Sequence, residues 1–181
     1  TPLKDEALTE ARRCLNCGCY AIHPSDVAPA LIAFDAKIAT NKREIGAEEF
    51  FAVKKPGNTV LERDEIITEI RIPAPPEGSA SVFMKFALRK AIDFSLVNCA
   101  VMLGGARPRI CLGAVAPEPY RAFKAEAAVA GKKIDETFAE TAGEAAVIDA
   151  RPFLCSKYKA QIAKTLVKRA LLSISNGAGQ T

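Results

Sequence analysis

Three cysteines, Cys14, Cys17 and Cys19, stand close together near the amino terminus of this 181-residue chain. Thiolates at this C-x-x-C-x-C spacing can converge on one soft metal ion or cluster, because a tight turn, here helped by Gly18, brings their sulfurs together. A tetrahedral site needs a fourth ligand. His23, the only histidine, could complete a zinc or iron site, or the fourth ligand could lie upstream in a longer parent protein. The alternative is a set of free thiols on a flexible arm.

Composition and charge narrow the class of protein. An apolar fraction of 49 % and a charged fraction of 25 % are typical of a folded globular chain and not of a disordered one. The formal net charge is only +4, and basic residues alternate with acidic ones, which argues against a nucleic-acid partner. No apolar run is long enough to span a membrane, so we expect no membrane partner, and the charged segment 1–13 is unlike a signal peptide. The crowded cysteines suit a reducing compartment, so we expect a cytoplasmic protein.

The first half of the chain predicts an arm and a small αβ segment. Residues 4–13 have the composition of a helix that leads into the cysteines. A short helix over residues 29–32 should follow, with Ser25 or Asp26 as its cap. The remaining elements of this half are antiparallel strands at 36–40 and 43–45, one helical turn at 48–51, and a strand at 66–73.

The second half predicts an α+β fold. Its strands, at residues 81–88, 95–103 and 109–115, should pair through short connections into an antiparallel sheet. Its helices should follow at residues 120–130, 134–148 and 156–173. Strands followed by helices, without alternation, predict a three-stranded antiparallel sheet packed on a three-helix layer.

A stretch of proline, glycine and small residues at 74–80 is the clearest internal boundary. It separates the small αβ segment, residues 24–78, from the α+β domain, residues 79–175. The cysteine-rich arm takes up residues 1–23, and residues 176–181 form a tail that we expect to fray.

Several short motifs follow one another in order along residues 24–172. They are Pro24-Ser25-Asp26, Thr59-Val60-Leu61, residues 68–73, Lys85 with Arg89, residues 93–97 and residues 112–120. Together they resemble the flavin subunit family of xanthine dehydrogenases, carbon monoxide dehydrogenases and related molybdopterin hydroxylases. The resemblance implies FAD as cofactor and a carboxyl-terminal domain like that of the CO dehydrogenase flavoprotein, which closes over the isoalloxazine ring.

The same resemblance implies three flavin contacts. Asp26 would lie near the ribityl chain or the ring, Ile67 would pack against the isoalloxazine, and Lys85 would approach its pyrimidine edge. A lysine at that edge would stabilise the negative charge that develops when the flavin is reduced. Taken by themselves, Asp26 could instead be a helix cap, Ile67 a core residue and Lys85 a solvated strand residue. Arg89 and Asp93 suit a structural ion pair across a turn.

The family's nucleotide-binding portion holds the pyrophosphate of FAD in glycine-rich loops. Such a cradle needs closely spaced backbone N–H groups, and this sequence contains no G-x-G-x-x-G pattern. We therefore expect FAD to bind only together with a complementary nucleotide-binding half.

The cysteine-rich arm departs from the flavin family. Residues 10–17 read E-A-R-R-C-L-N-C, and this E-A-x-R-C-L-x-C pattern resembles the cluster-binding segment of glutamate-synthase small-subunit-type oxidoreductases. In that family such cysteines help to ligate a four-iron, four-sulfur cluster. The resemblance implies an iron–sulfur cluster at Cys14, Cys17 and Cys19. Ligand chemistry keeps zinc as the alternative metal and His23 as a candidate fourth ligand.

These observations favour a module of a redox enzyme that takes part in electron transfer between flavin and iron–sulfur centres and is not active alone. The single histidine has no evident Ser or Cys partner, so no nucleophile and base pair can be assigned. The alternative is a cofactor-free scaffold or subunit-interaction domain within an oxidoreductase complex. Expected partners are other domains or subunits of a redox complex, and a homo-oligomer is left open.

Overall fold

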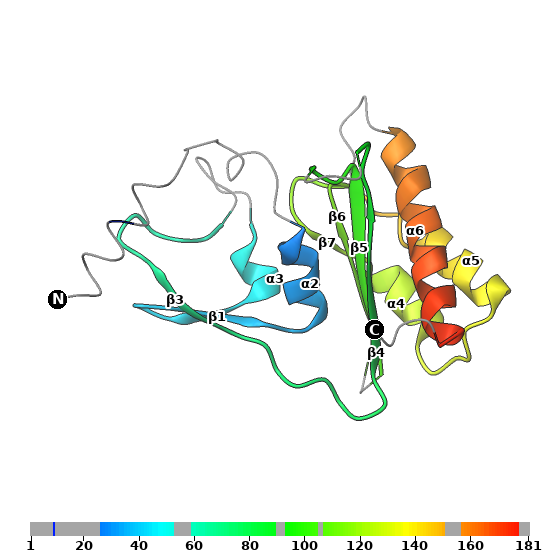
Figure 1. Ribbon diagram of the computed structural model, residues 1–181, viewed down its shortest axis with the longest axis horizontal. Coiled ribbons are helices and arrows are strands. Elements are labelled where there is room, and N and C mark those ends of the chain that lie inside the picture. Colours follow the sequence, from blue (N-terminus) through cyan, green and yellow to red (C-terminus); the bar gives the residue numbers. More distant parts are fainter. Residues whose placement is uncertain are drawn as a thin grey trace.

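The computed structural model describes residues 9, 26–52, 59–89, 93–104, 107–150 and 157–177 (Figure 1). The predicted helix at 4–13 falls outside these ranges except for Thr9. The proposed metal ligands Cys14, Cys17, Cys19 and His23 and the end of the tail also lie outside them. The described strands form two sheets, and every strand pairing is antiparallel, which confirms the predicted α+β class.

The small αβ segment folds as its sequence pattern predicts. Its sheet has the order β2-β1-β3 and consists of β1 (Lys37–Thr40), β2 (Glu44–Gly46) and β3 (Ile67–Arg71). Helix α2 (Val27–Ala33) precedes the sheet, and the short helix α3 (Ala47–Phe50) follows β2. The buried core of this segment includes Leu31, Ile32, Ile38, Ile45 and Phe50.

The larger sheet contains the three predicted strands and one more. Its order is β4-β5-β6-β7, with β4 (Ala80–Phe86), β5 (Val97–Leu103), β6 (Arg109–Gly113) and β7 (Tyr120–Arg121). The fourth strand takes up the first residues of the helix predicted at 120–130. Tyr120 and Arg121 pair with β6 instead, and the next backbone N–H, that of Ala122, still donates to Ile110 O.

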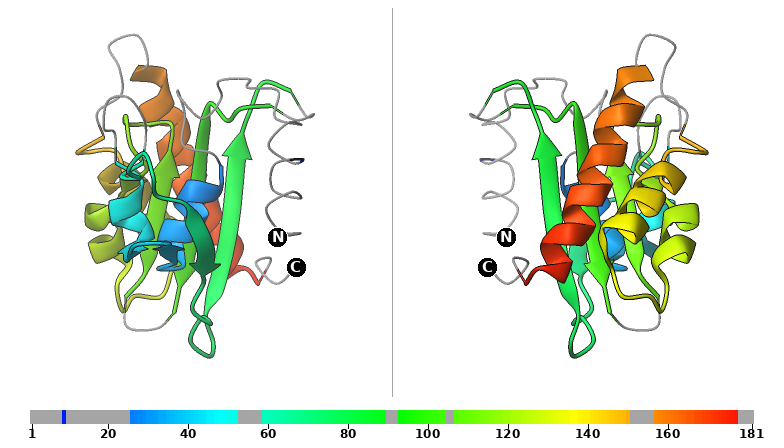
Figure 2. Two further views of the ribbon diagram at one scale, coloured as in Figure 1. Left: turned by 90° about the vertical axis from the view of Figure 1, so that its left-hand side faces the viewer. Right: turned by 90° about the vertical axis from the view of Figure 1, so that its right-hand side faces the viewer.

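Three helices pack on one face of this sheet (Figure 2). They are α4 (Phe123–Val129), α5 (Glu136–Ala145) and α6 (Lys157–Ser175). Small residues allow close packing; a Cβ added to Gly143 of α5 would lie 2.7 Å from the backbone O of Lys164 in α6. None of the described helices is long and apolar enough to cross a membrane.

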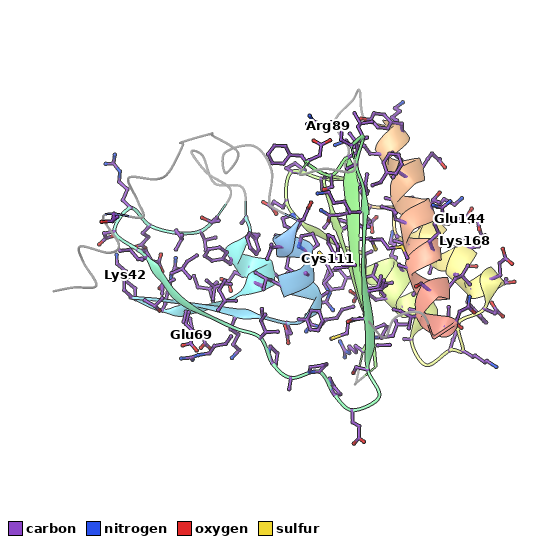
Figure 3. All side chains as sticks on the ribbon, in the orientation of Figure 1. Lys42, Glu69, Arg89, Cys111, Glu144 and Lys168 are labelled. Atoms are coloured by element: carbon purple, nitrogen blue, oxygen red, sulfur yellow. The ribbon has the colours of Figure 1, made fainter. Side chains whose placement is uncertain are left out.

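The small segment covers the other face of the larger sheet, but only in part. Helix α2 packs on β5 and β6, so β5 is buried along nearly its whole length. Cys111 of β6 joins the core of the small segment, between α2 and the sheet (Figure 3). Strand β4 is left more open on this face, where Phe83 is 42 % exposed. The candidate site lies on this face of the larger sheet, which α2 covers only in part.

The buried carboxylate of Glu65 links three parts of the small segment by hydrogen bonds. Glu65 accepts two hydrogen bonds from Arg43, at 2.9 and 3.0 Å, one from Thr40 and one from the backbone N–H of Glu62. These bonds, chiefly those from Arg43, lower the pKa of Glu65 from 4.5 to about 2. A carboxyl whose pKa is depressed in the folded state stabilises the fold above its unfolded pKa. That stabilisation is lost as the pH falls from about 4.5 towards 2.

We predict that Glu65→Gln lowers stability at neutral pH and flattens the fall in stability between pH 4.5 and pH 2. Some dependence of stability on pH should remain in this variant, because other carboxylates, such as Glu44, also have lowered pKa values. Urea unfolding at a series of pH values measures the slope. Glu62→Gln, which removes an exposed carboxylate of the same loop, is the matched control. A Glu65→Gln slope equal to that of the wild type would contradict the assignment.

Ala114, directly after β6, has a positive φ of 64°. An L-residue pays about 1–2 kcal/mol for this conformation, whereas glycine adopts it freely at a smaller entropic penalty. Ala114→Gly is therefore expected to raise the free energy of unfolding by about 0.5–1 kcal/mol, measured by urea unfolding. The same change at Ala116, which has no positive φ, should instead be neutral or destabilising. Equal changes in the free energy of unfolding for Ala114→Gly and Ala116→Gly would show that the backbone of Ala114 is not strained.

Candidate functional site

Four polar side chains meet where the start of α2 faces β4 and β5; we call Asp26, Lys85, Ser95 and Asn98 the Asp26 cluster. Lys85 Nζ donates to Asp26 Oδ2 at 2.5 Å. Ser95 Oγ and Asn98 Nδ2 donate to Asp26 Oδ1 at 2.7 and 2.9 Å, and Asn98 Nδ2 also donates to Ser95 Oγ. Two of the three predicted flavin residues, far apart in the sequence, are thus in direct contact.

The sheet register explains this convergence. Lys85 of β4 is the direct cross-strand neighbour of Asn98 of β5, so their side chains stand side by side on one face of the sheet. Val82 and Met84, which alternate with Lys85 along β4, contact the core under helices α4, α5 and α6. Lys85 and Asn98 therefore stand on the other face of the sheet, the one on which α2 packs. Asp26 precedes α2 but makes no capping hydrogen bond to it. Its carboxylate faces the lysine instead.

The cluster holds a fixed pair of opposite charges. Partial burial acts to raise the pKa of Asp26, but the hydrogen bonds from Lys85, Ser95 and Asn98 outweigh it, and the pKa lies below its usual value. Lys85 Nζ also donates to the backbone O of Asp93 at 2.5 Å. Arg89, labelled in Figure 3, donates in turn to both carboxylate oxygens of Asp93, and the two residues form the expected ion pair.

The Lys85 ammonium has one donor left within the described part of the chain. An ammonium group has three N–H donors. Two of them are taken, by Asp26 and by the Asp93 carbonyl. The side chain is 30 % exposed, so the third donor can reach a ligand from the open side.

Ile67 lies apart from this hydrogen-bonded cluster, on β3 opposite Thr40 of β1. It is 39 % exposed, so it is not a core residue of the described chain. Strand β3 is an edge strand, and all five of its residues are exposed. Its apolar neighbours Ile66, Ile70 and Ile72 are also exposed. An edge strand of this kind presents both apolar side chains and unpaired backbone groups to a partner.

Sequence reasoning missed Ser95, Asn98 and Gly113. Asn98 is 1 % exposed, within a strand of otherwise apolar residues. A single amide in such a run is the signal that could have marked it, because buried polar groups require hydrogen-bond partners. Gly113 is its neighbour on β6 and leaves room for it.

Metal binding and thiol chemistry find no support in the described residues. No group of three or more His, Cys, Asp or Glu side chains there could hold a metal ion. Burial raises the pKa of Cys99 to about 12 and raises that of Cys111 well above its usual value. Neither thiol is therefore suited to act as a nucleophile at neutral pH.

A surface pocket of about 520 Å³ lies elsewhere, lined by Glu48, Arg121, Phe123 and Asp149 among others. It contains none of the predicted flavin residues. Arg121 pairs with Glu48 and with Glu126, and Asp149 pairs with Lys124. Because these charges neutralise one another, the pocket offers less for ligand recognition than the Asp26 cluster does.

Comparisons with known proteins show two family matches along the chain. A family model for the CO dehydrogenase flavoprotein C-terminal domain matches residues 82–174, and one for the FAD binding domain in molybdopterin dehydrogenase matches residues 18–75. The carbon monoxide dehydrogenase medium chain of Hydrogenophaga pseudoflava is 31 % identical, over 82 % of this chain and 56 % of its own length. The putative xanthine dehydrogenase FAD-binding subunit of Escherichia coli K12 is 26 % identical, over 89 % of this chain and 59 % of its own length.

Solved structures show the same likeness. The crystal structure of quinoline 2-oxidoreductase from Pseudomonas putida 86 superposes with a TM-score of 0.74 and 27 % identity, over 89 % of this chain and 60 % of that one. The chain thus spans 56 to 60 % of the length of these relatives. The first family model matches more than half of the chain. The chain therefore belongs to the CO dehydrogenase flavoprotein C-terminal domain family, and a segment matching the FAD binding domain of molybdopterin dehydrogenases precedes that domain.

Proposed function

We propose that this chain is the ring-binding half of an FAD site in a redox enzyme of the molybdopterin-dependent dehydrogenase type. The observation that carries the proposal is the Asp26 cluster, in which two acceptors hold a lysine ammonium and, among the residues that the structure describes, its third donor has no acceptor. A fixed cation with a free donor suits a ligand that gains negative charge, such as a flavin on reduction.

Each predicted residue then has a distinct task. Lys85 would donate to a carbonyl at the pyrimidine edge of the ring, and Asp26 would hold Lys85 in place and face the ribityl side. Ile67 would pack against the ring plane. Bound flavin would supply the electron-accepting chemistry, while the chain orients the ring and sets the charge around it.

The surroundings of the cluster fit a flat, largely apolar ring. Phe83 stands two residues before Lys85 on β4, hence on the same face, and is 42 % exposed. The exposed isoleucines of β3 add apolar surface on the small segment. Ligand sites of this class combine apolar walls with a few well-placed polar groups.

The dinucleotide part of FAD requires another contributor. The sequence lacks a phosphate-cradling glycine pattern, and β3 exposes an apolar edge that a further domain or subunit would cover. The relatives are a medium chain and an FAD-binding subunit by name, which supports partner subunits in a larger complex. FAD binding would then be shared between this chain and a nucleotide-binding half.

The cysteine-rich arm adds a second proposed centre, an iron–sulfur cluster or zinc at Cys14, Cys17, Cys19 and His23. Its support is the ligand spacing. Iron and zinc analysis after anaerobic purification tests it, with Cys14→Ser as the variant that should lose metal. Full metal content in that variant would dismiss the thiolate site.

Titration of the purified chain with riboflavin, followed by quenching of flavin fluorescence, tests the ring-binding proposal. Saturable quenching is the expected result. No quenching, combined with self-association or retention of partner subunits, would overturn it in favour of the cofactor-free scaffold.

A further inference from the structure

Three residues form a row across the larger sheet beneath Asp26. Lys85 on β4 is paired with Asn98 on β5, and Asn98 is paired with Gly113 on β6. Cross-strand partners project on the same face of a sheet, so the row runs from the cation, through an amide, to a glycine.

The glycine is required by the amide beside it. A Cβ on Gly113 would lie 2.3 Å from Asn98 Oδ1 and 2.9 Å from both Cγ and Nδ2. Real side chains do not approach so closely, so any larger residue at 113 must push the amide away. Asn98 has little freedom to yield, since it is 1 % exposed and both of its N–H donors are engaged.

The amide orientation decides how Asp26 is held. Asn98 Nδ2 donates to Asp26 Oδ1 and to Ser95 Oγ, and Ser95 Oγ donates to the same carboxylate oxygen. Asn98 Oδ1 is buried, has no hydrogen-bond partner among the described residues, and rests against Gly113. In this orientation the Asn98 carbonyl oxygen accepts no described hydrogen bond, while the amide nitrogen donates to both Asp26 and Ser95. With Oδ1 of Asp26 held in this way, Oδ2 is presented to Lys85.

We infer that Asn98 and Gly113 are positioning residues for the proposed flavin site: Gly113 leaves the space in which Asn98 fixes the Asp26 carboxylate, and Asp26 in turn aims Lys85. The inference rests on the proposed function for its role towards flavin, but the linkage itself is a property of the protein alone. Within the described ranges, the charged group that faces Asp26 is Lys85 from β4. The Arg89–Asp93 pair is linked to it through the Asp93 carbonyl that Lys85 contacts.

Carbon-13 NMR titration of the Asp26 carboxyl in the intact chain is the test. Asn98→Ala and Gly113→Ala should each raise the pKa of Asp26 from its lowered value, because each removes the Asn98 hydrogen bond. The double variant should titrate like Asn98→Ala alone, since truncation of Asn98 frees the space that the methyl group added at position 113 would fill. Each single change should also weaken riboflavin binding about 2- to 10-fold, because a less firmly aimed Lys85 would lose part or all of the hydrogen bond that it would donate to the ring.

Gly143→Ala is the matched control, because its Cβ would also meet a neighbour, the backbone O of Lys164, but far along the chain from the cluster. It should destabilise the fold and leave the Asp26 titration unchanged. An unchanged Asp26 titration in Asn98→Ala would overturn the inference, even if Gly113→Ala fails to fold. Additive shifts in the double variant would show that Gly113 does not act through Asn98. Failure of riboflavin to bind, with the predicted titration shifts intact, would sink only the proposed function.

Discussion

Arg121→Met is expected to lower the free energy of unfolding by about 3–5 kcal/mol, the usual effect of removing one partner from a buried ion pair. Arg121 Nε and Nη2 donate to the two carboxylate oxygens of Glu126 at 2.8 and 2.9 Å. Glu126 is 7 % exposed, and its Oε1 also accepts the backbone N–H of Ile110. Arg121 Nη1 reaches Glu48 of α3 at 3.0 Å, so one guanidinium joins the small segment to the larger domain. Loss of the guanidinium would leave the buried Glu126 carboxylate without its cation and would remove the bond between the small segment and the larger domain.

Urea unfolding, followed by circular dichroism, measures this effect. Lys124→Met is the matched control: it removes an ion pair with Asp149 in which both side chains are at least half exposed. Exposed pairs contribute about 0–1 kcal/mol, so the control should stay close to the wild type. A loss no larger for Arg121→Met than for Lys124→Met would mean that the Arg121 bonds do not join the two parts.

Lys85→Met is expected to weaken flavin binding about 10- to 100-fold. A hydrogen bond from a charged donor contributes about 1.5–3 kcal/mol, and each 1.4 kcal/mol is a factor of ten in affinity. Methionine keeps much of the length and apolar stem of lysine, so the change removes the charge and the donors with little loss of volume. The loss should be larger for reduced than for oxidised flavin, because reduction places negative charge beside the ammonium.

Riboflavin titration measured by fluorescence quenching gives the affinity of the oxidised form. Lys124→Met again serves as control, since it also replaces an ion-paired lysine. Circular dichroism should establish that both variants remain folded. An affinity for Lys85→Met within the error of the wild type would remove Lys85 from the site.

The elements with strong periodic patterns could be predicted from the sequence. Helix α6 carries an apolar stripe, and its Leu166 and Ala170 are buried as that stripe requires. Strand β7 could not be predicted, because two residues are too few to show a period of two and their pairing depends on β6. The strand predicted at residues 66–73 is confirmed as β3, but exposure of the whole strand depends on what lies beside it in space.

The candidate site also contains some residues that could be predicted from the sequence and others that could not. Asp26 and Lys85 were predicted through resemblance to the flavin family, and the structure brings them into contact. Asn98 and Gly113 matter through their register with Lys85, and register is a relation between strands that spacing along one chain does not reveal. Ile67 was predicted from the same resemblance; its contact with a ring remains a prediction.

The affinity of this chain for FAD relative to riboflavin, measured side by side by fluorescence quenching, tests the central claim most directly. If the chain binds only the ring, the two affinities should agree within about threefold, and Lys85→Met should weaken both alike. FAD binding more than about 100-fold tighter than riboflavin would mean that the chain grips the dinucleotide by itself, which would contradict the account.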